Sequence, residues 1–504
     1  MLRITKTENG MVRGFPGTDA RITVFKGIPF ADNTSGENRW KAPQPAKDWE
    51  GIRDCYEFAP ITMQQIPGRD PDAFYSKEWH VDPNVPMSED GSLALNIWTP
   101  AKAADEKLPV MIWIFGGGLK EGYAYEMEFD GERIASRGVI LVSIAYRVNC
   151  FGFMAHPELT AENPEEPTNF GFLDQLAGIK WVKRNIANFG GDPDNVTIFG
   201  QSAGGGSTLA HLCSPKSRGY FEKAIVESAG GIATVYPTNR PMRHYRTLEK
   251  AEQDGVKFLK EYLGVETIAE ARKLDAKFIE EKFIESGMLW RGILDGKFNV
   301  EQVDDTVLKN EVAPVPIMIG NTNGEMPSGP RGETAEEWAK ANMGPFADEF
   351  MALAKEKAEA DGIDINKAVA VNTIELGAQM FADVMAKHGR DIYYYIFGPT
   401  MPGDNAGAFH SSDLWFEFET LMKCWRPFEG YHYDLSRKMC NYWTNFAKYG
   451  NPNGLDADGT PMPEWKPYNA EKPCNIEFFN EVKFNEDSFD NRQKFLVEAN
   501  LKSL

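Results

Sequence analysis

The sequence predicts an α/β fold in which helices flank both faces of a mostly parallel central sheet. Short, almost continuous apolar runs alternate with longer amphipathic segments along most of the chain. Continuous apolar runs are typical of strands buried on both faces, and strand–helix alternation is typical of α/β proteins. The chain has 504 residues, of which 42% are hydrophobic and 12% aromatic, so it can bury a large core.

Apolar runs supply the predicted strands, and a periodic segment supplies the clearest helix. Leu173, Leu176, Ile179, Val182 and Ile186 recur at steps of three or four, and the pair Gly190-Gly191 is expected to end that helix. The first hundred residues are instead short segments separated by Gly and Pro, which predicts antiparallel edge strands and loops. The predicted parallel strands are residues 110–115, 139–145, 196–199, 223–226, 316–319 and 392–397.

Two charged, helical regions are expected to be insertions that cover the sheet. They lie near residues 235–300 and 330–390. Length alone suggests about three domains at roughly 150 residues each, but some α/β folds reach this size around one sheet. The chain has no internal repeat and no long linker. We therefore expect residues 1–504 to form a single domain with these cap-like insertions.

Charge and composition exclude several classes of protein. The net charge of −20 is repelled by phosphate backbones and by anionic membranes, so nucleic-acid binding is not expected. No apolar run is long enough for a transmembrane helix, and the first residues do not resemble a signal peptide. Widely spaced cysteines argue against a zinc site or a disulfide framework and favour reduced, mostly buried thiols in a cytoplasmic protein. They are Cys55, Cys150, Cys213, Cys424, Cys440 and Cys474.

The strongest chemical signal is the segment Gly200-Gln201-Ser202-Ala203-Gly204, which matches the G-x-S-x-G nucleophile motif. The pattern alone is weak, but it follows a predicted strand and precedes a segment that can start a helix. This setting holds a serine in a strained turn with its hydroxyl exposed, and glycines on either side let the backbones pass. We therefore predict that Ser202 is a nucleophile.

Serine attack also requires donors for the oxyanion that forms on the substrate. Gly116, Gly117 and Gly118 follow an earlier predicted strand and leave their backbone N–H groups unhindered. The predicted donors are Gly117 and Gly118, with Ala203 as the third. The alternative is that the three glycines form only a turn. The presence of a nucleophile motif in the same chain argues against this alternative.

Among the histidines, His410 has the setting expected of a general base. It follows the last predicted strand through a flexible Pro- and Gly-rich loop, as expected for a residue that reaches a nucleophile at the strand ends. An orienting carboxylate should fall between nucleophile and base in the chain. Glu325 follows the predicted strand at 316–319, and Asp295 is the nearest competitor. Position alone leaves both open.

Longer segments carry a resemblance that extends over nearly the whole chain. Residues 24–31 (VFKGIPFA), 88–90 (SED), 95–100 (LNIWTP), 169–175 (NFGFLDQ), 189–193 (FGGDP), 443–447 (WTNFA) and 450–453 (GNPN) occur in a fixed order. In these segments the sequence resembles type-B carboxylesterases, a branch of the α/β-hydrolase family that includes bacterial para-nitrobenzyl esterases and cholinesterases. The resemblance implies an α/β-hydrolase fold with helical cap insertions.

The same resemblance implies roles for particular residues. It implies a triad of Ser202, Glu325 and His410, and it makes Ser228 a hydrogen-bond partner of that triad. Arg39–Glu89 and Arg147–Asp174 resemble the structural ion pairs of the family. Gly91 stands where secreted members have a disulfide cysteine, and Leu119 replaces the usual aromatic residue after the three glycines.

The predicted activity is hydrolysis of small carboxylic esters through an acyl-enzyme. No cofactor and no metal are expected, and the sequence leaves the oligomeric state open. Narrower alternatives are a sugar-ester or feruloyl esterase, or a thioesterase or amidase with the same triad. A non-catalytic binding module is disfavoured because every catalytic element is present. Candidates for the substrate pocket are Leu119, Met288, Leu289, Trp290, Trp415, Phe416 and Phe418, although aromatic residues are more often plain core.

Overall fold

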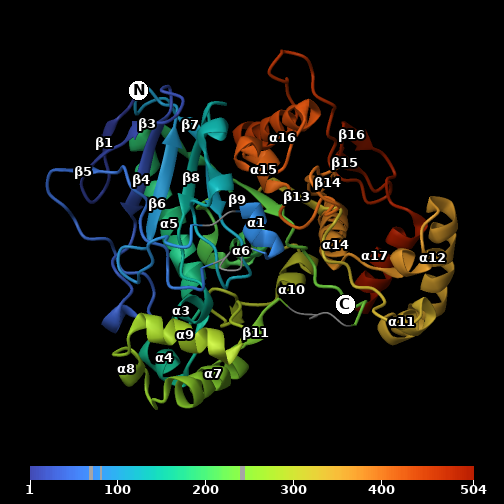
Figure 1. Ribbon diagram of the computed structural model, residues 1–504, viewed down its shortest axis with the longest axis horizontal. Helices are drawn as coiled ribbons and strands as arrows, with labels where there is room; N and C mark the ends of the chain where they lie inside the picture. Colours follow the sequence, from blue (N-terminus) through green and yellow to red (C-terminus); the bar gives the residue numbers. More distant parts are fainter. Residues whose placement is uncertain (67–71, 80–81, 239–243) are drawn as a thin grey trace.

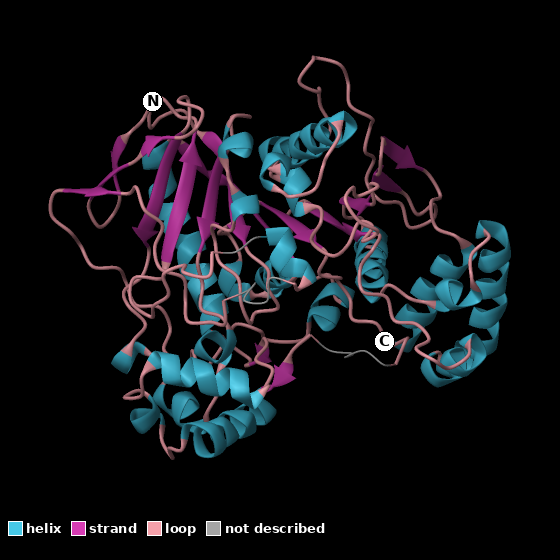
Figure 2. Ribbon diagram, viewed as in Figure 1, coloured by secondary structure: helices cyan, strands magenta, loops and turns pink. Residues whose placement is uncertain are grey.

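A twisted sheet runs through the molecule, with helices on both of its faces (Figure 1, Figure 2). The computed structural model describes residues 1–66, 72–79, 82–238 and 244–504. Within them the main sheet has 11 strands in the order β16-β15-β14-β13-β10-β9-β7-β8-β6-β4-β3. This is the α/β-hydrolase fold that the sequence predicts.

The central strands of this sheet pair in parallel. Every predicted strand segment falls on one of them, and β15 is the member that the sequence pattern did not reveal. The parallel strands are β7 (Leu108–Ile114), β8 (Ile140–Ile144), β9 (Gly191–Gln201), β10 (Lys223–Glu227), β13 (Ile317–Thr322), β14 (Ile392–Phe397) and β15 (Asn475–Phe478).

Antiparallel strands close both edges of the sheet. The N-terminal edge consists of β3 (Phe15–Pro16), β4 (Thr23–Pro29) and β6 (Ala94–Thr99), which are the antiparallel edge strands that the sequence predicts, and β16 (Val482–Asn485) forms the other edge. A separate small sheet contains β1 (Ile4–Lys6), β2 (Met11–Arg13) and β5 (Ile52–Asp54). Here β2 and β5 are parallel rather than antiparallel, because residues 30–51 carry the chain back before β5 begins.

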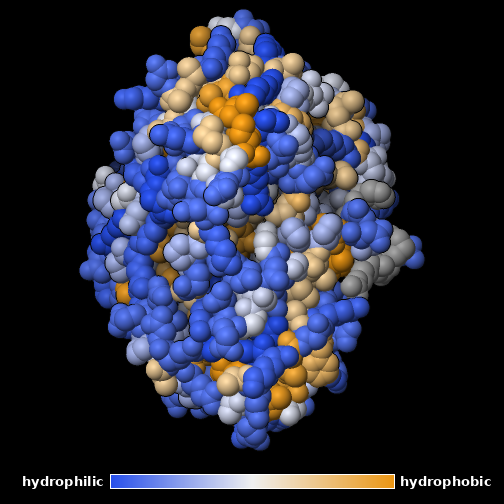
Figure 3. Space-filling model, turned by 90° about the vertical axis from the view of Figure 1, so that its left-hand side faces the viewer, coloured by the Kyte–Doolittle hydropathy of each residue, from blue (hydrophilic) through white to orange (hydrophobic). Residues whose placement is uncertain are grey.

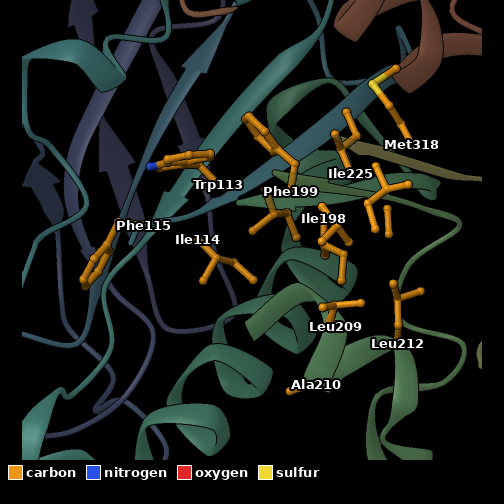
Figure 4. Close-up of a cluster of buried hydrophobic side chains, with 14 of the residues drawn as sticks. Trp113, Ile114, Phe115, Ile198, Phe199, Leu209, Ala210, Leu212, Ile225 and Met318 are labelled. Atoms are coloured by element: carbon orange, nitrogen blue, oxygen red, sulfur yellow. The ribbon is translucent and has the colours of Figure 1, made fainter. Parts of the chain in front are cut away.

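Side chains from the two faces of the sheet build the core on either side of it. Trp113 and Phe199 are paired across β7 and β9, and both rings contact Phe418 on one face. Ile198 alternates with Phe199 and therefore faces the opposite side. There Leu209 of α6 (Ala203–Cys213) lies toward it (Figure 4). Both faces of the central strands are thus covered, which explains their nearly continuous apolar sequence.

The helices around the sheet begin and end largely where the sequence indicates. The predicted helix is α5 (Phe170–Asn185), and it ends through a short 3-10 turn at Gly190, whose φ of 85° fits a glycine stop. Helix α16 (Gly430–Tyr449) contacts β7 and β9, with α15 (Leu414–Glu417) beside it. The remaining helices outside the insertions are α1 (Phe74–Trp79), α2 (Glu132–Ala135), α3 (Asn149–Phe153), α4 (Pro157–Glu162), α10 (Val303–Leu308) and α17 (Asn491–Ser503).

Both predicted insertion regions are helical. The first holds α7 (Leu248–Lys257), the π-helix η5 (Phe258–Leu263), α8 (Ile268–Ala271) and α9 (Ala276–Ser286), together with the short strands β11 (Arg246–Thr247) and β12 (Ile293–Leu294). The second holds α11 (Ala335–Asn342), α12 (Ala347–Asp361) and α13 (Ile365–Val369). Its last helix, α14 (Thr373–Lys387), packs on β13 and β14, so it belongs to the sheet-flanking layer rather than to a cap. The assignment of residues 1–504 to one domain stays a prediction.

Two buried ion pairs fix segments that are distant in the chain. Arg39 pairs with Glu89 at 2.5 Å, and its guanidinium also donates to the carbonyl oxygens of Ala271 and Leu274, which attaches the first insertion to the N-terminal part. Arg147 and Asp174 form the second pair at 2.7 Å. Buried charges need such complete pairing, because an unpaired partner is strongly destabilising.

The face shown in Figure 3 is mostly hydrophilic with separate hydrophobic patches. None of the described helices combines the length and the apolar character needed to cross a lipid bilayer. Five of the six cysteines are buried, as expected for mostly buried thiols.

The turn between β9 and α6 requires glycine on both sides of Ser202. A Cβ atom on Gly200 would lie 2.5 Å from the carbonyl oxygen of Ile114 on β7, and one on Gly204 would lie 2.0 Å from the same oxygen. Neither approach is possible for a real side chain without moving the backbone. The spacing of the two glycines therefore brings β7, β9 and α6 into direct contact.

We expect Gly204→Ala to destabilise the protein by about 1–3 kcal/mol, the usual range for overpacking, because the new methyl group meets backbone. Gly206→Ala in the same helix is the matched control, since a Cβ there meets no atom within 4 Å. Alanine also favours a helix over glycine by about 1 kcal/mol, so the control should be neutral or stabilising. Denaturant unfolding of both variants checks the pair, and equal losses of stability would contradict the contact argument.

Candidate active site

Ser202 lies in the sharp turn that joins β9 to α6. Its backbone has φ 57° and ψ −123°, a region that residues other than glycine rarely occupy. The Ser202 amide donates to the carbonyl oxygen of Glu227 at 2.8 Å, which fixes the turn against the end of β10. The side chain stays half-buried at the start of an 11-residue helix, where the helix dipole favours negative charge.

Ser202, His410 and Glu325 form one hydrogen-bonded chain. Oγ of Ser202 lies 2.8 Å from Nε2 of His410, and Nδ1 of His410 lies 2.5 Å from Oε2 of Glu325. Glu325 follows β13, and His410 lies in the loop between β14 and α15. The three side chains thus come from segments that follow three parallel strands, and those segments meet at the carboxyl edge of the sheet.

Contacts between the loops hold this arrangement. Ser411 donates its hydroxyl to Oε1 of Gln201 at 3.0 Å, so a neighbour of the histidine is tied to a neighbour of the serine. Gly324 pairs with Phe409 in an isolated bridge, and the Gly324 amide donates to the Ala408 carbonyl oxygen at 3.1 Å. The sequence analysis missed these residues. Their only signal is that each stands next to, or close to, a predicted triad member.

The glycine loop after β7 runs directly beside Ser202. A Cβ on Gly116 would lie 3.3 Å from the Cβ of Ser202. Gly117 and Gly118 have φ values of 95° and 67°, which glycine adopts without strain. The amides of Gly117, Gly118 and Ala203 donate no hydrogen bond to the residues that the structure describes.

Two buried amide side chains brace the glycine loop. The side-chain amide of Asn149 donates to the carbonyl oxygen of Lys120 at 3.3 Å. The backbone N–H of Asn149 donates to the carbonyl oxygen of Leu119 at 2.7 Å. Gln64 accepts from the Gly122 amide at 2.7 Å and donates back to the Gly122 carbonyl oxygen at 3.0 Å. The loop therefore holds its shape through side chains that reach it from elsewhere in the chain.

His410 sits in an acidic and largely buried environment. Burial lowers its pKa, but the hydrogen bond and charge of Glu325, together with the charge of Asp413, outweigh that effect and leave the pKa raised. Burial and the charge of Glu325 in turn raise the pKa of Asp413 to about 7. Two carboxyl groups thus raise the pKa of the His410 imidazole: Glu325, which is hydrogen-bonded to it, and Asp413, which acts through its charge.

Further buried carboxyl groups lie behind the nucleophile turn. Glu227 accepts from the indole Nε1 of Trp443 at 2.6 Å, and burial raises its pKa to about 8. Burial and the charges of Glu227 and Asp413 raise the pKa of Glu417 as well. These groups favour their neutral forms, which avoids the large free-energy cost of burying several like charges together.

Comparison with known proteins agrees with this geometry. The profile of the carboxylesterase family matches residues 2–331 and 332–496. The chain belongs to the carboxylesterase family. Cocaine esterase from Oryctolagus cuniculus is 33% identical over 489 residues, covering 90% of this chain and 88% of the relative. A medium-chain fatty acyl-CoA hydrolase precursor from Anas platyrhynchos is 32% identical, covering 89% of this chain and 84% of the relative.

Solved structures of carboxylesterases have the same fold. A PNB esterase superimposes with a TM-score of 0.77 at 27% identity, covering 99% of this chain and all of the other. A carboxylesterase from Geobacillus stearothermophilus gives a TM-score of 0.79 at 28% identity, with 98% of this chain and all of the other covered. The chain is accordingly a carboxylic ester hydrolase of the serine hydrolase class, as the sequence analysis expected.

Three predicted pocket residues of this carboxylesterase lie in its core instead. Trp415, Phe416 and Phe418 have no exposed surface, so no substrate can touch them. The ring of Phe418 contacts Trp113 at 5.0 Å, and the short helix α15 turns all three residues inward. Leu119 also packs against the main hydrophobic core.

Two other predictions have mixed outcomes. Ser228 follows β10 at the correct edge of the sheet, but its hydroxyl makes no hydrogen bond to any described residue, so the predicted contact with the triad is absent there. Asp295, the competing acid, accepts from Asn169 and from the amides of its own loop, and therefore has a structural role. Among the described residues, no group of three or more His, Cys, Asp or Glu side chains is arranged to hold a metal ion.

A cavity of about 510 Å³ adjoins the glycine loop of the carboxylesterase. Its lining includes Gly117 and Gly118 of the glycine loop and Met288, Leu289 and Trp290 of the first insertion, and a role of these last three residues in substrate binding stays a prediction. Neither Ser202 nor His410 lines it, so the cavity reaches the site through Gly117 and Gly118 of the glycine loop.

A different set of aromatic residues lies on the histidine side, and the sequence analysis missed it. Phe74 of α1 meets Phe409 edge-on at 4.8 Å, and Tyr75 lies 6.4 Å from the same ring. Burial and then the charge of Glu325 raise the pKa of Tyr75, which shows that α1 stands close to the triad. Both aromatic side chains of α1 remain partly exposed.

A buried arginine connects α1 to the histidine loop. Arg426 pairs with Glu78 of α1 at 2.5 Å and with Asp404 of the loop at 2.7 Å. The same guanidinium lies 5.1 Å from the ring centre of Phe409. These contacts join segments hundreds of residues apart, so no local pattern in the sequence could have revealed them.

The pH dependence of this carboxylesterase should report the charge beside His410. The negative charge of Asp413 raises the pKa of His410, so Asp413→Asn should lower that pKa. A base acts only when neutral, so the acidic limb of the kcat/KM profile should move to lower pH. Glu417→Gln is the control because Glu417 is not among the groups that shift His410. An acidic limb that stays at the same pH or moves to higher pH in Asp413→Asn would contradict the idea that the charge of Asp413 raises the pKa of His410.

Proposed function

We propose that this enzyme hydrolyses carboxylic esters through an acyl-enzyme formed on Ser202. His410 acts as general base and then as general acid, and Glu325 orients its imidazole. The observation that carries this proposal is the continuous chain of contacts at 2.8 Å and 2.5 Å from the serine oxygen to the carboxylate. Three separate loops must come together to build it, which argues against an incidental serine.

The reaction begins when His410 Nε2 accepts the proton of Ser202 and the serine oxygen attacks the ester carbonyl carbon. The imidazolium then protonates the leaving alcohol as the carbon–oxygen bond breaks, which leaves an ester on Ser202. Water next gives a proton to His410 and attacks this ester, and collapse releases the acid and restores the serine hydroxyl. Throughout, Glu325 holds Nδ1 protonated and stabilises the imidazolium.

The oxyanion of each tetrahedral intermediate is assigned to the amides of Gly117, Gly118 and Ala203. Support comes from their lack of described partners and from the position of the glycine loop beside Ser202. Removing one such donor typically costs about 3–4 kcal/mol of transition-state stabilisation. The bracing by Asn149 and Gln64 keeps the loop in place before the substrate arrives, so little reorganisation is needed.

The two sides of the site are proposed to bind the two parts of the ester. The leaving oxygen must face His410 to receive its proton, which directs the alcohol toward Phe74 and Tyr75 of α1. The acyl group then extends the other way, past Gly117 and Gly118 into the cavity of about 510 Å³. A cavity of this size is typical of small-molecule sites.

A thioester is the second substrate class that a specific observation favours. A relative at 32% identity is a fatty acyl-CoA hydrolase, and the same triad can cleave a thioester. Sugar esters and feruloyl esters remain narrower versions of the main proposal. We also infer a cytoplasmic location, which the six free cysteines support.

Ser202→Ala should reduce hydrolysis of para-nitrophenyl acetate, butyrate and octanoate by several orders of magnitude, because the covalent intermediate can no longer form. The acyl-chain length that the wild type prefers also indicates how long an acyl group the cavity accepts. A thioester of the preferred acyl group can be assayed in parallel. Ser136→Ala, at a serine whose hydroxyl only donates to the carbonyl of Arg133, is the control. Equal activity of Ser202→Ala and wild type would reject the serine mechanism.

Glu325→Gln should lower kcat by roughly 10⁴-fold while KM changes little, because an amide can hold the imidazole in the wrong tautomer. Steady-state kinetics with para-nitrophenyl butyrate measures both constants. The competing acid gives a direct control, since Asp295→Asn should leave kcat within severalfold of the wild type. A larger loss in Asp295→Asn than in Glu325→Gln would reverse the assignment.

A further inference from the structure

The cavity beside the glycine loop has charged as well as apolar walls. Phe283, Ile284, Met288 and Trp290 supply the apolar surface. The charged lining residues are Lys120, Glu121 and Arg291. Lys120 and Arg291 are exposed, so these charges lie where the cavity opens to solvent.

Arg291 is the charge in this cavity that lacks a partner. It forms no hydrogen bond and no ion pair with the residues that the structure describes. The nearby Arg246 is itself paired with Asp254, and after burial the like charge of Arg291 is the influence that lowers the pKa of Arg246.

The other two charges largely neutralise each other. Nζ of Lys120 lies 3.6 Å from Oε2 of its neighbour Glu121. Burial raises the pKa of Glu121, while the charge and hydrogen bond of Lys120 lower it. The balance of the described lining is therefore one positive charge, located on Arg291.

We propose that the cavity binds an acyl group that ends in a carboxylate, with Arg291 as its counter-ion. The preferred substrates are then hemiesters, the monoesters of dicarboxylic acids. This inference rests on the proposed function, which directs the acyl group into this cavity. The planar guanidinium matches the two oxygens of a carboxylate, and the apolar wall packs against the methylene groups between the ester and that carboxylate.

The position of Arg291 sets the size of the expected effect. The side chain is exposed and lines a second, neighbouring cavity as well, so it lies at the rim rather than at the sealed end. An ion pair in partial contact with water gives about 1 kcal/mol, which corresponds to less than about a tenfold gain. We therefore expect a moderate preference that depends on salt, rather than an absolute requirement for the anionic group.

The test compares two esters that differ only at the end of a six-carbon acyl chain. Mono-4-nitrophenyl adipate carries the terminal carboxylate, and 4-nitrophenyl hexanoate does not. We expect Arg291→Gln to lower the ratio of their kcat/KM values by about 5- to 10-fold while hexanoate hydrolysis stays within about twofold. Arg291→Lys should restore part of the ratio, and 0.5 M NaCl should lower the ratio in the wild type but not in Arg291→Gln.

Lys282→Gln is the matched control. It removes one positive charge from α9, but Lys282 pairs with Glu285 and does not line the cavity. This variant should leave the substrate ratio unchanged, which separates a local contact from the general field of the protein. An equal fall in Lys282→Gln, or an unchanged ratio in Arg291→Gln with hexanoate still hydrolysed, would overturn the inference and leave the esterase function standing.

A binding measurement separates this inference from the catalytic proposal. Titration calorimetry of mono-4-nitrophenyl adipate is carried out on Ser202→Ala with and without Arg291→Gln. We expect the added substitution to weaken binding by about 5- to 10-fold. Binding that depends on Arg291, together with a wild-type protein that hydrolyses neither ester, would reject the catalytic proposal alone, and binding indifferent to Arg291 would reject this inference alone.

Discussion

The close approach of β7 to the turn between β9 and α6 is the constraint on which the site depends. The carbonyl oxygen of Ile114 occupies the space that a Cβ of Gly200 or Gly204 would need. Because Ile114 is the last residue of β7, the chain enters the glycine loop at the point where Ser202 turns toward solvent. One backbone contact therefore places Ser202 and the glycine loop next to each other, and wider strand spacing would separate them.

The electrostatics of the site follow from the same compactness. Residues that approach Ser202 from β10 and α15 bring Glu227, Asp413 and Glu417 into a buried region where their charged forms are unfavourable. Such groups lower stability as pH rises, because the unfolded chain ionises near its ordinary pKa while the folded chain resists ionisation. The negative charges of Glu325 and Asp413 nevertheless favour the protonated form of His410. In the proposed mechanism the fold thus retains carboxyl groups that reduce its stability at high pH but stabilise the imidazolium.

Local patterns in the sequence were enough to predict the central strands and to select Ser202 and His410, whereas Glu325 was chosen over Asp295 only through the family resemblance. These features depend on short motifs whose backbone geometry is set within a few residues. The sequence could not show which way aromatic residues point, and Trp415 was assigned to the pocket although α15 turns it fully into the core. It also could not reveal the link from Arg426 to α1, because that contact depends on how distant segments pack in three dimensions.

The two sides of the site differ in a way that is expected to separate the two parts of a substrate. Partly exposed aromatic rings of α1 lie on the histidine side, whereas an unpaired cation lies beside the glycine loop. The net charge of −20 repels anions at long range, but salt screens charges beyond about 8 Å at physiological ionic strength. The nearest charges therefore determine the electrostatic potential inside the cavity. There Lys120 and Glu121 largely neutralise each other, and the positive charge of Arg291 remains. On the proposed role of Arg291, a single cation at the cavity attracts an anionic acyl group although the net charge of the chain opposes anions at long range.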